Sequence, residues 1–107
     1  MRLRLDKPWT PLTDETVKRI PGQLGVYELA DESGRVLYVG MAGGRSLFGL
    51  RGEIGQHAGG TATQFRYEVN MQYLTRHQEL LMLHVADTGE LPELNRTNPP
   101  ARLGRIG

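Results

Sequence analysis

The clearest pattern in the chain is a pair of short segments in which apolar and polar side chains alternate. GVYELA covers residues 25–30, RVLYVG covers residues 35–40, and the DESG between them supplies turn-forming residues. Alternation with a period of two is typical of a strand, and two such strands joined by a short turn form a hairpin. The sequence therefore predicts an antiparallel hairpin over residues 25–40.

A short helix is predicted before this hairpin. The hydroxyl of Thr13 can cap a helix start, and the two acidic residues that follow it suit the positive end of the helix dipole. The Pro-Gly pair at residues 21–22 ends the helix.

The segment after the hairpin combines a helical pattern with many glycines. Apolar side chains recur at spacings of three and four, at Leu47, Leu50 and Ile54. This spacing predicts a helix from Leu47 to His57, capped by Ser46. Glycines also recur at intervals of three, at Gly49, Gly52 and Gly55. Since each costs about 0.5–1 kcal/mol relative to alanine, we expect either an incomplete helix or another backbone close to these glycines.

Two further elements complete the predicted fold. Alternation from Phe65 to Met71 predicts a third strand, and the leucine-rich segment from Tyr73 to about Asp87 predicts the longest helix. This helix is apolar over most of its circumference, so we expect it to be largely buried. Thr88-Gly89 ends it, and an irregular segment follows. The sequence thus predicts an α+β fold in which helices pack around a three-stranded, mainly antiparallel sheet.

Length and composition indicate one ordinary globular domain. The 107 residues form a single domain with its core at about 20–95 and an irregular basic tail at 96–107, in which Arg96, Arg102 and Arg105 are the charged residues. There is no cysteine, which excludes disulfides and thiolate metal sites. No apolar run has the roughly 18 residues of a membrane helix, and the start of the chain does not have the pattern of a signal peptide. We therefore expect a cytoplasmic protein with no membrane partner.

Two tripeptides at the ends of the hairpin carry a family resemblance. Gly25-Val26-Tyr27 opens the first strand and Tyr38-Val39-Gly40 closes the second, and a Pro-Gly turn leads into the first. This arrangement resembles the GIY-YIG nuclease family, with valine for isoleucine in both tripeptides, and the resemblance covers about residues 20–95. It implies an enzyme that hydrolyses phosphodiester bonds in DNA, or in RNA, with Mg²⁺ or Mn²⁺ as cofactor.

The resemblance also implies the roles of individual residues. Tyr27 corresponds to the tyrosine that helps to activate the attacking water, and Tyr38 to a second tyrosine that lines the site. Arg51 corresponds to the helix arginine that holds the scissile phosphate, and His57 lies near the position of a histidine found in some members. Asn95 corresponds to the asparagine that closes the site. The residues expected to contact nucleic acid are Arg45, Arg51 and Asn95.

Two residues of the long helix compete for the role of metal ligand. Glu79 is the preferred candidate, because a carboxylate suits hard Mg²⁺ and an acid among leucines is costly unless it is paired, solvated or bound to a metal. A place at the solvent edge, or a pair with Arg76, is the alternative for Glu79. An alignment of the leucines instead places His84 at this position, and histidine suits Mn²⁺ or a later transition metal better than Mg²⁺. The two side chains point about 140° apart around a helix, so they are exclusive alternatives.

A second function stays open beside the nuclease. Met41 stands where many members of the family have lysine, and the net charge is only +1. Both features favour a catalytically weak or inactive module, on the same fold, that binds nucleic acid or another protein.

Overall fold

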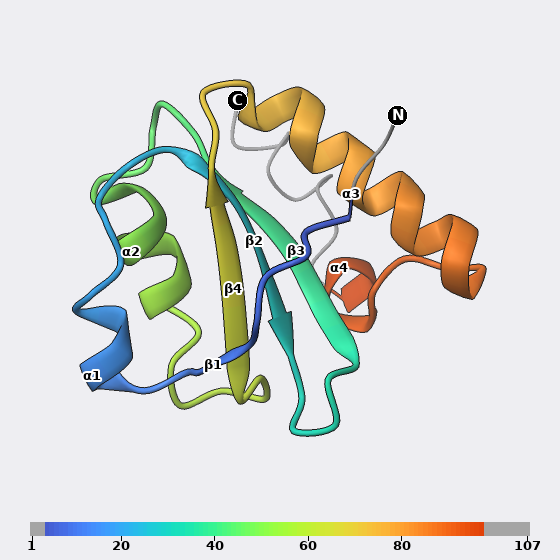
Figure 1. Ribbon diagram of the computed structural model, residues 1–107, viewed down its shortest axis with the longest axis horizontal. Coiled ribbons are helices and arrows are strands. Elements are labelled where there is room, and N and C mark those ends of the chain that lie inside the picture. The colour runs from blue at the N-terminus through green and yellow to red at the C-terminus, as the bar shows by residue number, and fades with distance from the viewer. Residues whose placement is uncertain (1–3, 98–107) are drawn as a thin grey trace.

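A computed structural model describes residues 4–97 of the protein. The chain forms an α+β fold, as predicted, in which one antiparallel sheet is covered by helices (Figure 1). The elements are β1 (Thr10–Pro11), α1 (Asp14–Val17), β2 (Gly25–Ala30), β3 (Val36–Ala42), α2 (Gly49–Gly55), β4 (Gln64–Val69), α3 (Tyr73–Thr88) and α4 (Glu93–Thr97).

The sheet has four strands in the order β1-β4-β2-β3, so the prediction of three strands is wrong. The additional strand, β1, pairs only Thr10 with Phe65 and Pro11 with Gln64. Two residues are too few to produce an alternating pattern, and proline is tolerated there because the strand lies at the sheet edge. The predicted hairpin of β2 and β3 is confirmed, and β4 pairs antiparallel with the other side of β2.

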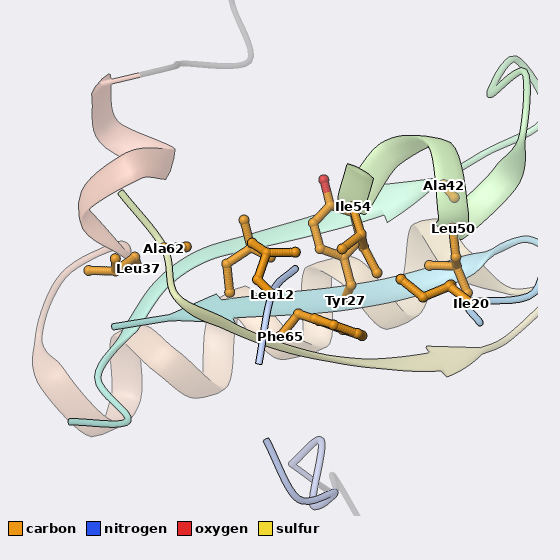
Figure 2. Packing of buried hydrophobic residues seen from close by; sticks show 10 residues of the cluster. Leu12, Ile20, Tyr27, Leu37, Ala42, Leu50, Ile54, Ala62 and Phe65 are labelled. Atoms are coloured by element: carbon orange, nitrogen blue, oxygen red, sulfur yellow. The ribbon is translucent and has the colours of Figure 1, made fainter. Parts of the chain in front are cut away.

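Helices cover both faces of this sheet. Figure 1 shows α1 and α2 on one side and α3 on the other, with α4 beside the outer strand β3. The α2 face holds the larger core cluster, which consists of Leu12, Ile20, Tyr27, Leu29, Leu37, Ala42, Leu50, Ile54, Ala62 and Phe65 (Figure 2). The α3 face holds a second cluster formed by Leu5, Val26, Val39 and Leu80. Side chains that alternate along a strand point to opposite faces, so the neighbours Val26 and Tyr27 of β2 serve different cores.

The glycine of the second tripeptide makes room for the tyrosine of the first. Tyr27 lies directly opposite Gly40 in the hairpin, and it is only 1% exposed. A Cβ atom at Gly40 would lie 2.3 Å from Cζ of Tyr27 and 2.7 Å from Cε2 of Tyr38. The ring of Tyr27 therefore occupies the space that a side chain at residue 40 would need.

Helix α2 is shorter than predicted, and one of its expected core residues faces solvent. Leu50 and Ile54 are fully buried against the sheet, as the spacing predicts, but Leu47 precedes the helix and is 88% exposed. Gly49 has a φ of +58°, and a Cβ there would lie 2.6 Å from the carbonyl carbon of Gly22. Another backbone does approach this glycine, and it belongs to the turn before β2.

The long helix α3 is not largely buried, contrary to the prediction. Only Arg76 and Leu80 are buried within it, whereas Leu74 is exposed and Met82 is 69% exposed. A helix that lies against one face of a sheet can bury one stripe of its surface, however apolar its other side is. None of the helices within residues 4–97 is long and apolar enough to span a membrane.

The chain after α3 is more regular than predicted. Residues 93–97 form the short helix α4, which contacts β3, where an irregular segment was expected. The remainder of the predicted basic tail, residues 98–107, lies outside the described residues.

Gly40→Ala is expected to destabilise the fold by about 1–3 kcal/mol, because the new methyl group would overlap the buried ring of Tyr27. Urea unfolding monitored by far-UV circular dichroism measures this change. Gly44→Ala is the matched control, since its Cβ would lie 3.6 Å from the Tyr73 hydroxyl, an ordinary contact. Equal stability of the two variants would contradict the packing role of Gly40.

Candidate active site

Three of the predicted site residues meet on the α2 face of the sheet. The ring centroids of Tyr27 and Tyr38 are 6.0 Å apart, and that of His57 lies 6.0 Å from Tyr27 and 5.2 Å from Tyr38. The hydroxyl oxygen of Tyr27 is 3.4 Å from Nε2 of His57. Figure 2 shows this hydroxyl beside Ile54 and directed away from the other side chains of the core. We call Tyr27, Tyr38 and His57 the Tyr-Tyr-His cluster.

Burial controls the protonation of this cluster. Burial raises the pKa of Tyr27 well above its usual value, and the neighbouring Tyr38 and Glu53, together with a hydrogen bond to Tyr38, raise it further. Burial also lowers the pKa of His57, although the negative charge of Glu53 opposes this effect. At neutral pH the cluster therefore contains a protonated phenol and a neutral imidazole.

Glu53 is a residue of this site that the sequence prediction missed. It lies on α2 one turn before His57, and its charge acts on both Tyr27 and His57. Its carboxylate accepts hydrogen bonds from the hydroxyl of Ser46, at 2.9 Å, and from the side-chain amide of Gln56, at 3.4 Å. The spacing of four residues between Glu53 and His57 is a signal in the sequence that they share one side of a helix.

Arg51 does not join the cluster. It lies about 160° from Glu53 around α2, and its Nε donates a hydrogen bond of 2.8 Å to the carbonyl of Ile20. Arg45 and Glu53 both line an open hollow of about 360 Å³. The other residues that line this hollow are Ser46, Leu47, Phe48, Gly52 and Gln56.

Asn95 holds the edge strand at the second tripeptide. Its side-chain oxygen accepts from the backbone N–H of Val39 at 2.8 Å, and its side-chain nitrogen donates to the carbonyl of Val39 at 3.0 Å. Nε2 of His77 also lies 3.1 Å from this carbonyl oxygen. Asn95 is buried, so its amide positions the backbone between Tyr38 and Gly40 and does not face solvent.

Glu79 and His84 lie away from the cluster, on helix α3 across the sheet. Glu79 is 3.3 Å from the guanidinium of Arg76, which also binds Glu68 of β4 at 2.9 Å. Burial by itself would raise the pKa of Glu68, but hydrogen bonds from Arg76 and Asn70 lower it overall. Burial lowers the pKa of His84, which also senses the charges of Asp87, Arg35 and Arg96 near the far end of α3. Neither predicted metal ligand shares a surface with the tyrosines.

The carboxylate of Glu53 beside the cluster could serve as one ligand of a divalent cation whose other ligands are water and substrate phosphate oxygens. Within residues 4–97, no three His, Cys, Asp or Glu side chains gather as a preformed metal cage. Mg²⁺ nevertheless often binds through one or two carboxylates, with water and substrate phosphate oxygens as its other ligands. Glu53 offers one carboxylate beside the Tyr-Tyr-His cluster, which meets this smaller requirement.

Comparison with known proteins places the chain in a family. A family model described as "Domain of unknown function (DUF7508)" matches residues 1–87. The chain belongs to the DUF7508 family. No curated protein and no solved structure matches it. The part that matches DUF7508 includes the Tyr-Tyr-His cluster and Glu53, whereas α4 and Asn95 lie beyond it. The resemblance to GIY-YIG nucleases therefore stays a prediction.

The free energy of unfolding is expected to fall as the pH drops below about 6.5. Burial lowers the folded-state pKa of His57, His77 and His84, so the unfolded chain takes up protons before the folded one does. The three neutral histidines contribute fully to stability above the pKa that they have in the unfolded chain. This contribution is lost as the pH falls towards their lower pKa in the folded chain. Urea unfolding followed by Trp9 fluorescence at pH 7.5 and 5.5 measures the difference.

His57→Gln tests whether His57 contributes to this pH dependence of stability, because glutamine does not titrate between pH 5.5 and 7.5. The variant should lose part of this pH dependence. A difference between the two pH values as large as in the unaltered chain would contradict a neutral, buried His57.

Proposed function

We propose that this DUF7508 chain is a metal-dependent endonuclease of the GIY-YIG type, which hydrolyses phosphodiester bonds in nucleic acid, with DNA preferred to RNA. The observation that carries the proposal is the meeting of Tyr27, Tyr38 and His57, three groups that can transfer or hold a proton, in one cluster. They come from two strands and from the chain after a helix, and they adjoin a carboxylate and an open hollow.

His57 is the general base of the proposed reaction. In the proposed tautomer Nε2 of His57 carries the proton, and this nitrogen lies 3.4 Å from the hydroxyl oxygen of Tyr27. The oxygen of Tyr27 is then able to accept a hydrogen bond from Nε2–H of His57. This leaves Nδ1 unprotonated and available to take a proton from the attacking water. A base with a pKa below 7 is in its active form at neutral pH.

Charge at the site comes from Glu53 and Arg45. Glu53 is the residue that would hold Mg²⁺ or Mn²⁺, and a bound divalent ion supplies Lewis-acid stabilisation of the phosphoryl oxygens. Arg45 lines the same hollow and makes no ion pair within residues 4–97, so its guanidinium is available to a phosphate group. These two residues replace Glu79 and Arg51 in the roles that the family resemblance implies.

A second function, binding of nucleic acid without catalysis, is favoured by the position of Arg51. Its guanidinium binds the carbonyl of Ile20 and lies away from the cluster, so it does not supply the positive charge that catalysis needs beside the scissile phosphate. Isothermal calorimetry separates the two functions. Uptake of Mg²⁺ or Mn²⁺ in the presence of an oligonucleotide favours the enzyme, and binding of the oligonucleotide without metal uptake favours the second function.

His57→Gln is expected to slow cleavage by about 10²–10⁴-fold, because it removes the general base. Cleavage of supercoiled plasmid and of labelled oligonucleotides in Mg²⁺ or Mn²⁺, separated on gels, measures this change. Circular dichroism checks that the variant folds. The proposal fails if the unaltered protein cuts no substrate with either metal, or if His57→Gln cuts at the original rate.

The metal ligand is identified by a matched pair of carboxylate-to-amide changes. Glu53→Gln should abolish metal-dependent cleavage, whereas Glu79→Gln should leave the rate within about twofold, since Arg76 keeps its ion pair with Glu68. Loss of cleavage in Glu79→Gln, with its fold intact, would return the metal to α3 and contradict the role of Glu53.

A further inference from the structure

We infer that Phe48 is a stacking platform for an unpaired base, and that the chain binds single-stranded nucleic acid at the hollow beside the Tyr-Tyr-His cluster. This inference names the substrate class of the proposed function and rests on it. The platform consists of the Phe48 ring, and the hollow also contains Arg45 and Gln56.

The ring of Phe48 has one side covered and the rest open. A Cβ atom at Gly52 would lie 3.0 Å from Cβ of Phe48 and 3.5 Å from its ring atom Cδ2, so the side chain rests on the bare backbone of α2. Phe48 is nevertheless 62% exposed. An exposed aromatic ring that lies against a helix offers surface on which a base can stack.

Hydrogen bonds hold the loop that carries this ring. The backbone N–H of Gly44 donates to the Tyr73 hydroxyl at 3.1 Å, and the hydroxyl of Ser46 bonds Glu53. The backbone N–H of Leu50 donates to the carbonyl of Gln23 at 2.8 Å, which fixes the first turn of α2. A ring held in advance loses little freedom when a ligand stacks on it.

Polar groups around the ring suit a nucleotide better than an apolar partner. Arg45 offers a cation for the phosphate, and the amide of Gln56 and the carboxylate of Glu53 offer hydrogen-bonding groups on the same hollow. The volume of about 360 Å³ lies at the small end of the range for ligand sites, about 300–1,000 Å³. One nucleotide unit therefore matches the hollow in size and in chemistry.

The charge of the chain favours a single strand over a duplex. Duplex binding depends mainly on many cations that contact phosphates, whereas the net charge here is +1 and Glu53 adds a negative charge at the hollow. Stacking on an aromatic ring does not need a net positive charge, but it does need a base that has left the helical stack.

Binding of a fluorescein-labelled 20-nucleotide oligothymidylate, measured by anisotropy in EDTA, tests the inference. Phe48→Ala should weaken binding by about 5- to 150-fold, the range for loss of one stacked base. Leu74→Ala is the matched control, because Leu74 is a similarly exposed apolar residue of α3 that does not line the hollow, and its Kd should change by less than about twofold. A duplex of the same length should bind more weakly than the single strand.

Phe48→Trp reports the contact directly. This variant should keep its affinity, and its added tryptophan emission should be quenched by the oligonucleotide. Trp9 provides an internal reference, since it packs against Arg66 and its signal should not change. An unchanged Kd in Phe48→Ala, or the absence of single-strand binding in the unaltered chain, would overturn the inference.

Sedimentation velocity tests the alternative that a second copy of the chain, and not a nucleic acid, covers Phe48. Self-association that is abolished by Phe48→Ala would assign the ring to a second copy of the chain and overturn the inference. Because EDTA prevents metal-dependent cleavage, the binding result is independent of the enzyme assay. Binding through Phe48 without any cleavage would remove only the proposed function, and cleavage with an unchanged Phe48→Ala variant would remove only this inference.

Discussion

The ring of Tyr27, packed across the backbone of Gly40, is the interaction on which both the core and the candidate site depend. It fills the space between the hairpin and α2, and there it contacts the cluster of apolar side chains on that face. The same burial keeps its hydroxyl protonated and places it against Tyr38 and His57. A change that loosened this ring would therefore affect stability and the chemistry of the site together.

Buried ion pairs lie on the α3 face of the sheet, whereas the candidate site lies on the α2 face. On the α3 face, Arg66 binds Glu28 at 2.7 Å, and Arg76 lies between Glu68 and Glu79. Charges that are this far buried need partners, because an unpaired ion in the interior is strongly destabilising. These pairs satisfy each other within the fold. On the α2 face the Tyr-Tyr-His cluster contains the protonated phenol of Tyr27 and the neutral imidazole of His57, and the charge of Glu53 acts on both.

For the proposed function, this division means that a chain with a net charge of only +1 can hold the reacting groups together on one face. A neutral imidazole, a protonated phenol and one carboxylate together form a proton-transfer system, which needs an external cation or Arg45 to receive a phosphate. In the inferred binding mode, the exposed ring of Phe48 adds affinity that does not depend on charge. The site and the hollow share Glu53, so recognition and chemistry are adjacent along α2.

The sequence by itself determined the elements with a repeated pattern: the hairpin of β2 and β3, the strand β4 and the helices α2 and α3. The resemblance of its two tripeptides to a known family pointed to Tyr27, Tyr38 and His57, and the fold brings these three residues together. The apolar spacing predicted that Leu50 and Ile54 face the sheet, but the tertiary structure alone placed Glu53 near the cluster and Arg51 away from it. It likewise decided that Glu79 pairs with Arg76 and that two residues at positions 10–11 form a strand. The spacing of apolar residues in the sequence shows whether a segment is a helix or a strand and which side is buried. The neighbours of its polar side chains depend on contacts with residues that are distant in the sequence.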